Sequence, residues 1–488
     1  MRKFTYYTLF FSFIFLSFSS AQTKKRIGKL GAIYTPNLIK IKKSKDSVQV
    51  VEKVLTSKEI VDETIEKIKK DPVLRNAHWG FVVYDPKREK IINSYNEQDA
   101  FTPASTTKLL TTETILDLLG KNFVWHTQLE HSGEIDENGV LNGNLYIVGS
   151  GDPSLGTGKA GAYKYGEIIN DFIYAMTEKG ITKVNGDIFI QNAFFKKNKA
   201  RFLPKNIVWL NTKHYYLPVG STPIIGNSGE KKTLSRSPFK KQKTFFYISP
   251  ITNRIVLSNN YQPQEYTTKI SVPPYYLANA LRKNLIRRKI GVTGKVLAKN
   301  ADINPEARKK ITVYESPRLE DIIFYTNKRS DNALAEALMK ASGFYTYGDQ
   351  TKSSGRQAVV EHLTEEGFHL DGFNYHDGSG LSRKNKVSPI AHAKFLSNLM
   401  DEKHFPELFN SLPVGGQSGT LRRMFKTTGN GQVFAKTGTL RGVKTLAGYI
   451  KTNKGETLVF SLLINNYRGS VSQVKKKMEK ILAPVLDL

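Results

Sequence analysis

The sequence predicts a mixed α/β protein, of the α+β kind, with two or three domains. Its 488 residues exceed the length that one hydrophobic core usually supports. The 39% hydrophobic and 24% charged residues are near the average for globular proteins, so a folded chain is expected. Helical and strand-like patterns alternate towards both ends of the chain, and short strand-like runs fill its middle.

The first predicted elements are a helix, a strand pair and a second helix. Apolar residues recur at helical spacing from about Ser57 to Lys70. Trp79 to Tyr84 and Lys90 to Tyr95 flank an Asp-Pro-Lys turn, which indicates two connected strands. The apolar stretch from Thr107 to Leu119 is followed by a glycine and predicts a helix. Ser105 therefore lies at the start of that helix.

The middle and the end of the chain differ in their patterns. From residue 126 to 300 we expect separate β-rich material, because short runs such as Leu145 to Val148 and Ile188 to Ile190 alternate with Gly and Pro. The remainder predicts two helices, three strands and a closing helix, which are Leu319 to Tyr325, Ala333 to Lys340, Gln432 to Lys436, Leu446 to Ile450, Leu458 to Ile464 and Val471 to Leu482.

The N-terminus has the three-part layout of a secretory signal. Arg2 and Lys3 precede an apolar run from Phe4 to Phe18, and small residues follow at Ser19 to Ala21. An uncleaved membrane anchor is the alternative, but the run is shorter than the roughly 20 residues that span a bilayer. We expect cleavage after Ala21 and export to the periplasm, with possible peripheral association with membrane or wall.

The chain is strongly basic, with 73 Lys and Arg against 43 Asp and Glu and a net charge of +30. Nucleic acid, an anionic membrane surface or an acidic polymer could attract such a charge, and a solvated basic surface is the plain alternative. Export favours wall polymers or lipid head groups over nucleic acid. The stretch from Lys24 to Lys45 carries eight basic residues and no acid, which is typical of a flexible electrostatic tether.

The absence of cysteine limits the chemistry that the chain can perform. With no Cys, disulfides, thiol catalysis, Cys-bound zinc and a lipidated N-terminal Cys are excluded. The nine His residues include no H-E-x-x-H pair, so a metalloenzyme has little support. Any nucleophile is therefore an oxygen or an amine.

Three short motifs combine into one candidate site. Ser105-Thr106-Thr107-Lys108 places a hydroxyl and an amine on one helical face, although a single S-x-x-K is common by chance. Ser330-Asp331-Asn332 offers a hydroxyl and a carboxamide, with a helix N-cap as the alternative.

Lys436-Thr437-Gly438-Thr439 lies on a predicted strand, where the glycine would let a substrate approach the backbone. A strand-end turn would explain this glycine equally well. The order and joint content of the three motifs outweigh these alternatives, because they supply a nucleophile with its base, a polar relay and a basic strand edge, as in penicillin-recognising enzymes.

Longer segments make the resemblance specific. The chain resembles the penicillin-binding protein 4 type of D-alanyl-D-alanine carboxypeptidase and endopeptidase over most of residues 52 to 488. The segments that carry the resemblance, besides the three motifs, include YTNKRSDN at Tyr325 to Asn332 with Ala335-Glu336, DGSGLSR at Asp377 to Arg383 with Val387 to Pro389, AKTGTLRGV at Ala435 to Val443, Ser411 to Val414 with Gly419 to Leu421, and GSGDP at Gly149 to Pro153.

The resemblance implies a penicillin-binding, β-lactamase-like serine transpeptidase fold, in which helices flank an antiparallel sheet. Ser105 and Ser330 are 225 residues apart, and the family explains such a gap by β-rich domains inserted between the S-x-x-K and S-x-N motifs. The implied division is a signal peptide at 1–21, a basic linker at 22–51, a penicillin-binding domain in two parts at 52–125 and 301–488, and the insertion at 126–300.

The resemblance also implies a mechanism without a metal or organic cofactor. Ser105 would form an acyl-enzyme with peptidoglycan stem peptides or, as an inhibited adduct, with β-lactams. The other implied catalytic residues are Lys108 as base, Ser330 as proton relay, Asn332 as a holder of Lys108 and substrate, and Lys436 as a source of positive charge. The implied substrate-binding residues are Thr437, Gly438, Thr439 and Arg383.

Alternatives apply to the role of Arg383, to recognition of the peptide and to the function itself. Arg383 would face the peptide stem, or form only a surface ion pair. Gln191 to Phe194 lack the acidic residue that relatives often carry there and that would recognise the third residue of the peptide. A β-lactamase or esterase on the same fold and a non-catalytic wall-binding protein are alternative functions, and the sequence does not indicate an oligomeric state.

Overall fold

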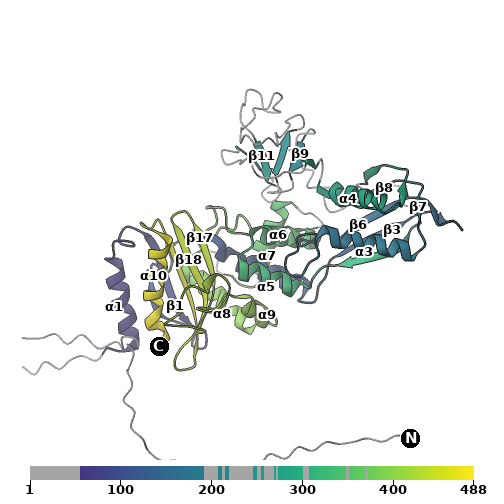
Figure 1. The fold of residues 1–488 in the computed structure, drawn as a ribbon. Coiled ribbons are helices and arrows are strands. Elements are labelled where there is room, and N and C mark those ends of the chain that lie inside the picture. The colour runs from purple at the N-terminus through teal and green to yellow at the C-terminus, as the bar shows by residue number, and fades with distance from the viewer. Residues whose placement is uncertain are drawn as a thin grey trace, which may run out of the picture. The chain divides into compact units, whose positions relative to one another are not determined.

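The computed structural model describes residues 55–191, 207–210, 215–218, 246–249, 254–257, 269–270, 273–299, 307–347, 351–368 and 372–488 (Figure 1). The expected signal peptide at 1–21, the basic linker at 22–51 and residues 192–194 lie outside this range. No helix among the described residues is long and apolar enough to cross a membrane.

The central sheet joins the two ends of the described chain. Its strands follow the order β17-β18-β19-β1-β2, and all neighbours are antiparallel. The pairing of Trp79 with Ile464 brings β1 beside β19. The strands are β1 (His78–Asp85), β2 (Lys90–Tyr95), β17 (Val433–Leu440), β18 (Val443–Lys451) and β19 (Thr457–Asn465).

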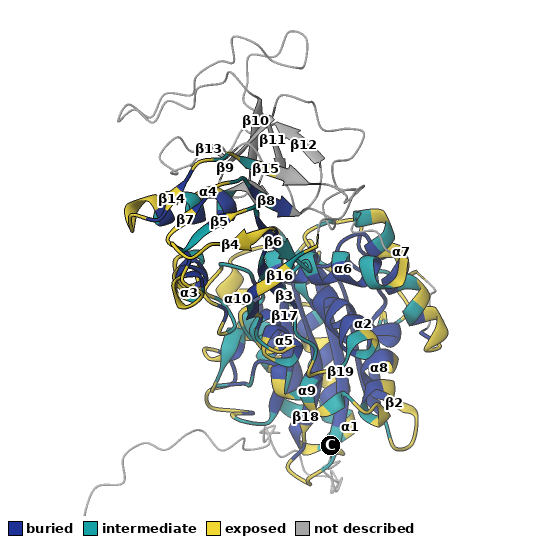
Figure 2. Cartoon of the chain, turned by 90° about the vertical axis from the view of Figure 1, so that its right-hand side faces the viewer, coloured by how far each residue is buried: buried dark blue, intermediate teal, exposed yellow. Residues whose placement is uncertain are grey.

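Helices cover both faces of this sheet, which confirms the predicted fold class (Figures 1 and 2). Side chains alternate between the faces along each strand, so Leu446 packs into one core cluster and the adjacent Ala447 into the other. The first cluster lies against α1 (Ser57–Lys69) and α10 (Val471–Leu482), and the second against α2 (Lys108–Leu119) and the helices that follow it. Full burial of one such aliphatic side chain contributes about 1.5–3 kcal/mol.

Local capping signals explain where several helices begin. Thr56 and Glu59 form a capping box at α1, and Ser470 and Gln473 form another at α10. Helix α8 (Pro389–Asn398) starts after Ser388, whose hydroxyl accepts from the amide of Ala391. Each such cap contributes on the order of 1 kcal/mol.

The second face of the sheet carries a larger helical layer than the sequence predicted. The predicted helices at 319–325 and 333–340 extend to α5 (Leu319–Arg329) and α6 (Asn332–Tyr347). Sequence analysis did not predict α7 (Lys352–Glu365), α8 or α9 (Phe405–Ser411). Gly343 on α6 lies so close to α7 that an added Cβ would stand 2.4 Å from the Gly355 nitrogen.

A second five-stranded sheet forms within the middle of the chain, in the order β15-β8-β6-β3-β16. Two helices that sequence analysis did not predict, α3 (Tyr165–Glu178) and α4 (Pro273–Arg287), contribute to the same apolar cluster as this sheet. The middle segment therefore contains helices as well as the expected strands. The strands of this sheet are β3 (His126–His131), β6 (Leu145–Gly149), β8 (Ile188–Gln191), β15 (Val296–Lys299) and β16 (Lys309–Glu315).

Strand β16 follows residue 300, where the expected insertion at 126–300 ends. It pairs antiparallel with β3, although residues 301–488 were assigned to the second part of the penicillin-binding domain. The sheet of the middle segment therefore runs to Glu315 rather than ending at residue 300. A further sheet joins β4 (Glu134–Ile135), β5 (Val140–Asn142), β7 (Lys183–Val184) and β14 (Gly291–Val292). A three-stranded sheet is formed by β9 (Ile207–Leu210), β10 (Tyr215–Pro218) and β13 (Lys269–Ile270). Strand β11 (Phe246–Ser249) pairs with β12 (Arg254–Leu257).

Candidate active site

Ser105 lies in a single 3₁₀ turn, Ala104–Thr107, that leads directly into α2. Ala104 has a positive φ of 49°, an unusual conformation for a residue with a side chain. Gly380 packs on this turn so closely that an added Cβ would lie 1.8 Å from the Ala104 oxygen. The turn is thus held from outside the helix, and the Ser105 side chain is only partly buried at the start of it.

Lys108 is fully buried one turn after Ser105. Its Nζ donates to Ser105 Oγ at 3.0 Å, to Asn332 Oδ1 at 2.7 Å and to the Ser379 carbonyl at 2.6 Å. All three acceptors are uncharged. Burial lowers the pKa of Lys108 to about 8, although the more distant charges of Glu336, Asp377 and Asp331 act in the opposite direction. About a tenth of Lys108 is therefore neutral at pH 7, far more than for a lysine with the ordinary pKa, and this form is able to accept a proton.

Ser330 and Lys436 form the second half of the cluster. Lys436 Nζ donates to Ser330 Oγ at 2.8 Å and to the carbonyl of its neighbour Thr437 at 2.9 Å. Burial, with the charges of Lys108 and Lys444, holds the pKa of Lys436 well below its usual range. The structure thus brings together five residues that the sequence singled out: Ser105, Lys108, Ser330, Asn332 and Lys436.

The S-x-N segment serves two purposes at once. Ser330 ends α5 in the left-handed conformation, with φ of 58°, and Asn332 begins α6. Between them, Asp331 Oδ1 accepts from the amide of Leu334 at 3.0 Å, as an N-cap does. The N-cap alternative therefore applies to Asp331, while its two neighbours face Lys436 and Lys108.

Gly438 has a role that differs from the expected one. An added Cβ would lie 2.1 Å from Thr445 Oγ1 and 2.7 Å from the Pro103 oxygen. Thr445 itself donates to the Pro103 oxygen at 2.6 Å. The glycine is therefore explained by the close packing of the Ser105 turn on β17, and not by room for a substrate on this face.

Arg383 is exposed and lies outside the cluster of buried lysines. Its guanidinium donates to the carbonyl of Arg441, in the turn between β17 and β18. This contact ties the DGSGLSR segment to the end of the β17 strand beside Thr439. The partner of Arg383 is thus a backbone carbonyl rather than the carboxylate of the alternative surface ion pair.

Two residues behind the site had no role assigned by sequence analysis. Glu336 Oε1 accepts from the amide and the hydroxyl of Ser379, at 3.0 and 2.7 Å, and Ser379 presents its carbonyl to Lys108. Asp377 accepts from the amides of Gly380 and Ser382, at 2.8 and 2.7 Å. Both acids thus shape the backbone of the segment that contacts Lys108. Their presence in the quoted motifs was the available signal.

The middle segment also reaches the site. Lys159 Nζ lies 2.5 Å from Asp331 Oδ2, and this ion pair joins the loop before α3 to the S-x-N motif. In the same loop, Asp152 of the GSGDP motif accepts from the amide and hydroxyl of Ser154, at 2.7 and 2.6 Å. This motif therefore shapes the loop that carries Lys159.

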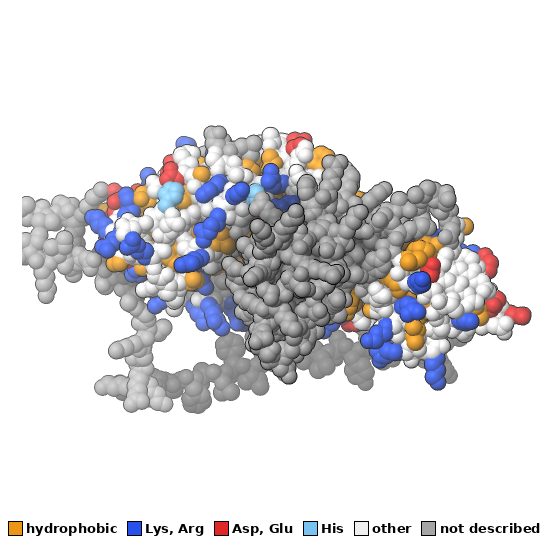
Figure 3. Space-filling view, turned by 90° about the horizontal axis from the view of Figure 1, so that it is seen from above, with side chains coloured by type: hydrophobic (Ala, Val, Ile, Leu, Met, Phe, Trp, Pro, Cys, Tyr) orange, Lys and Arg blue, Asp and Glu red, His pale blue; other side chains and the backbone are white. Residues whose placement is uncertain are grey.

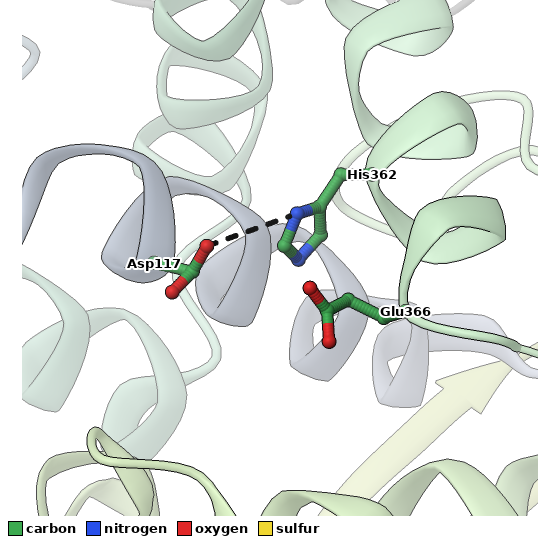
Figure 4. Close-up of side chains that lie close together, drawn as sticks. All are labelled: Asp117, His362 and Glu366. Atoms are coloured by element: carbon green, nitrogen blue, oxygen red, sulfur yellow. Dashed lines mark ion pairs between the residues drawn. The ribbon is translucent and has the colours of Figure 1, made fainter.

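A separate cluster of titratable residues lies between α2 and α7 (Figure 4). Atoms of Asp117, His362 and Glu366 lie within 4.8 Å of one another, and His362 Nε2 is 2.7 Å from Glu113 Oε1. Burial alone would lower the pKa of His362, but Glu113 and the other carboxylates prevail and raise it. The carboxylates favour the charged imidazole, and this geometry is that of an ion-pair cluster.

Comparison with known proteins places the chain in one family. A family model described as D-Ala-D-Ala carboxypeptidase 3 (S13) matches residues 61–218 and 251–485. The chain is 25% identical over 448 residues to the D-alanyl-D-alanine carboxypeptidase DacB of Haemophilus influenzae, covering 82% of this chain and 88% of the relative. It is 26% identical over 451 residues to a D-alanyl-D-alanine carboxypeptidase of Actinomadura sp. (strain R39), covering 83% of this chain and 81% of that relative.

The fold agrees with these matches. The crystal structure of penicillin binding protein 4 from Haemophilus influenzae superposes with a TM-score of 0.63 at 21% identity, covering 88% of this chain and 99% of that chain. The family model covers most of both parts of the chain that form the central sheet and its helices. The chain belongs to the D-Ala-D-Ala carboxypeptidase 3 (S13) family of serine peptidases.

Proposed function

We propose that this protein is a serine-type D-Ala-D-Ala carboxypeptidase and endopeptidase that acts on peptidoglycan stem peptides and is acylated by penicillin at Ser105. One observation carries the assignment to this residue: a buried lysine, Lys108, lies 3.0 Å from the Ser105 hydroxyl and has only uncharged acceptors. Such a lysine can take the proton that a serine must lose to become a nucleophile.

The geometry supports a two-stage reaction. Ser105 Oγ attacks the carbonyl carbon between the two D-alanines, and its proton passes to Lys108. The C–N bond breaks as this proton passes from Lys108 through the Ser330 hydroxyl to the leaving amine, which frees D-alanine, leaves an ester on Ser105 and returns Lys108 to its neutral form. Water then hydrolyses this ester and restores the hydroxyl. Lys436 donates to Ser330 at 2.8 Å and so orients the hydroxyl of this relay.

Binding groups at the edge of β17 complete the proposal. The backbone amides of Ser105 and Thr439 form the oxyanion hole, in which one donor is typically worth about 3–4 kcal/mol. The hydroxyls of Thr437 and Thr439 bind the terminal carboxylate of the peptide. Arg383, held on the adjacent turn, contacts the peptide stem.

Acylation by labelled penicillin tests this function directly. Ser105→Ala removes the nucleophile, so we expect a folded protein without a covalent adduct in intact-mass spectrometry. The exposed Ser353 on α7 offers a matched control, and Ser353→Ala should be labelled like the wild type. Undiminished labelling of Ser105→Ala would refute the assignment. A rapidly hydrolysed adduct would indicate a β-lactamase or esterase, and no adduct at all with wild type would leave a wall-binding protein.

We also propose export to the periplasm, with the signal peptide at 1–21 removed and the basic segment at 22–51 associating weakly with anionic wall or lipid. On the face shown in Figure 3, Lys and Arg side chains are spread over the described surface with few acidic side chains among them. Deleting residues 24–45 removes basic side chains, so it should weaken sedimentation with anionic vesicles. The assay uses low salt, because exposed charges are screened beyond roughly 8 Å at physiological salt. Vesicle binding that is unchanged by added salt and by the deletion would contradict this role.

A further inference from the structure

A lysine that the proposed reaction does not use lies buried at the edge of the site. Lys444 is 3% exposed and stands on β18 directly opposite Thr439 of β17. Its Nζ donates to Thr439 Oγ1 at 2.6 Å. Among the described residues, no carboxylate forms an ion pair with it.

Such a placement costs free energy. An ammonium group taken out of water needs an opposite charge or several hydrogen bonds to compensate for its lost hydration. In the described part of the chain the Thr439 hydroxyl is the one hydrogen-bond partner of Lys444, and the charge that acts on it is a further cation, Lys475 on α10. Burial and the charge of Lys475 together lower the pKa of Lys444 to about 7. The surroundings of Lys444 therefore lack the negative charge that an anionic ligand would bring.

The Thr439 hydroxyl connects this buried cation to solvent. Residues at alternate positions of a strand share one face, so Thr437 and Thr439 lie on the same face of β17, and Lys444 projects from the same face of its partner strand. Thr439 is exposed. Because its oxygen accepts from Lys444, its one proton is free to be donated to a ligand on the solvent side.

We propose that Lys444 is a positioning residue for the ligand carboxylate, which it serves by orienting the Thr439 hydroxyl and by supplying the buried positive charge behind it. This inference rests on the proposed function, because the anion is the free carboxylate of a D-Ala-D-Ala peptide or of a penicillin. Lys444 thereby adds a cation to a carboxylate site that was otherwise made of two threonine hydroxyls.

The arrangement makes carboxylate binding depend on a proton. An anion at Thr439 favours the charged form of Lys444 and so raises its pKa when the ligand binds. At pH values at which Lys444 of the free protein is partly neutral, Lys444 therefore takes up a proton when the ligand binds. The preference for an anionic ligand should decline as the pH rises through the region of 7 to 9, whereas the reaction of an uncharged ligand has no such loss.

The test compares benzylpenicillin with its methyl ester, in which an uncharged ester replaces the carboxylate. Second-order rates of acylation of Ser105 are measured by mass spectrometry for wild type and Lys444→Met. We expect the ratio of the acid rate to the ester rate to fall about tenfold in the variant, the size of one lost hydrogen bond to a charged group. The rate with the ester should be nearly unchanged, which also shows that the variant is folded.

Two further variants sharpen the result. Lys444→Arg keeps the charge and should keep a preference for the acid. Lys475→Met removes a nearby cation on α10 that lowers the pKa of Lys444, so the preference for the acid should persist to higher pH in this variant. An equal loss with acid and ester, or no loss with either, would overturn the inference. If Lys444→Met does not fold, the pH dependence of the acid-to-ester ratio in wild type decides, and a ratio that stays constant from pH 6 to 9 would refute it. Failure of both ligands to label wild-type Ser105 would instead refute the proposed function.

Discussion

Helix α2 carries a buried lysine at its beginning and two acidic side chains farther along, and the two regions differ in the partners of these groups. Lys108 at its first position is bonded only to uncharged oxygens, and its pKa falls to about 8 because burial is the dominant influence. Glu113 and Asp117, farther along, lie next to His362 of α7, whose pKa is raised.

The difference shows how one scaffold holds ionisable groups for two purposes. A buried amine surrounded by neutral acceptors is kept close to losing its proton, which suits a base. An imidazole next to carboxylates has its charged form favoured, which suits an ion pair that links two helices. The partner in direct contact, and not burial alone, therefore separates a reactive group from a structural one.

The largest effect is expected from Lys108→Arg. A guanidinium keeps its proton at any working pH and cannot act as the base. We expect penicillin acylation of Ser105 to fall by at least about 100-fold, the lower end of the range for general base catalysis. Stopped-flow or mass-spectrometric rates would measure the loss, with circular dichroism to confirm folding.

Lys121→Arg provides the control, since Lys121 follows the end of α2 and forms an exposed ion pair with Glu407. This variant should react like wild type. A Lys108→Arg protein that is acylated at nearly the wild-type rate would show that Lys108 acts only through its charge.

The next effect is the pH dependence of the wild-type enzyme. Lys108 must be neutral to accept a proton, and its pKa is about 8, so the reactive fraction falls roughly tenfold for each pH unit below that value. Acylation rates measured from pH 6 to 9 should rise and level off above about pH 8. A flat profile over this range would contradict the role of Lys108 as base.

A smaller effect is expected from Glu336→Gln. The Glu336 charge raises the pKa of Lys108, and the glutamine keeps an oxygen that can accept from Ser379. We therefore expect the midpoint of the acylation profile to move to lower pH, while the plateau rate changes by less than about tenfold. Loss of the plateau without a moved midpoint would indicate that Glu336 only supports the Ser379 backbone.

The smallest effect concerns the second cluster on α2. A raised pKa in the folded state means that protonated His362 stabilises the protein fully below its unfolded pKa and loses this contribution as the pH rises through the folded pKa. His362→Gln should therefore lower the free energy of unfolding more at pH 6 than at pH 9, by a difference of about 1 kcal/mol.

Urea denaturation at the two pH values would measure this difference. His78, whose pair with Asp99 is half exposed, serves as the matched control, and His78→Gln should change the free energy of unfolding less than His362→Gln does. If the effect of His362→Gln were equal at both pH values, the cluster would not depend on the imidazole charge. Acylation of Ser105 should be unaffected in either variant.

Short-range patterns in the sequence determined much of the central architecture. The strand and helix periodicities at the two ends of the chain correspond to β1, β2, β17, β18, β19 and α10, and the last of these was predicted with the bounds that it has in the structure. The spacing within S-x-x-K placed Lys108 one turn after Ser105, because three residues make nearly one helical turn. These features depend only on neighbours in the chain, so they were predictable from it.

Contacts between distant segments were decided by the tertiary structure alone. The pairing of β16 with β3, which carries the middle sheet past residue 300, is one example, since strand partners are not specified by local pattern. The hydrogen bond that Lys108 donates to the Ser379 carbonyl is another example, because every residue has a backbone oxygen and the sequence does not show which one a side chain will contact. Lys444 illustrates the physical reason most clearly: a lysine in the sequence suggests an exposed charge, and only the packing of β18 among its neighbours removes it from water and changes its pKa.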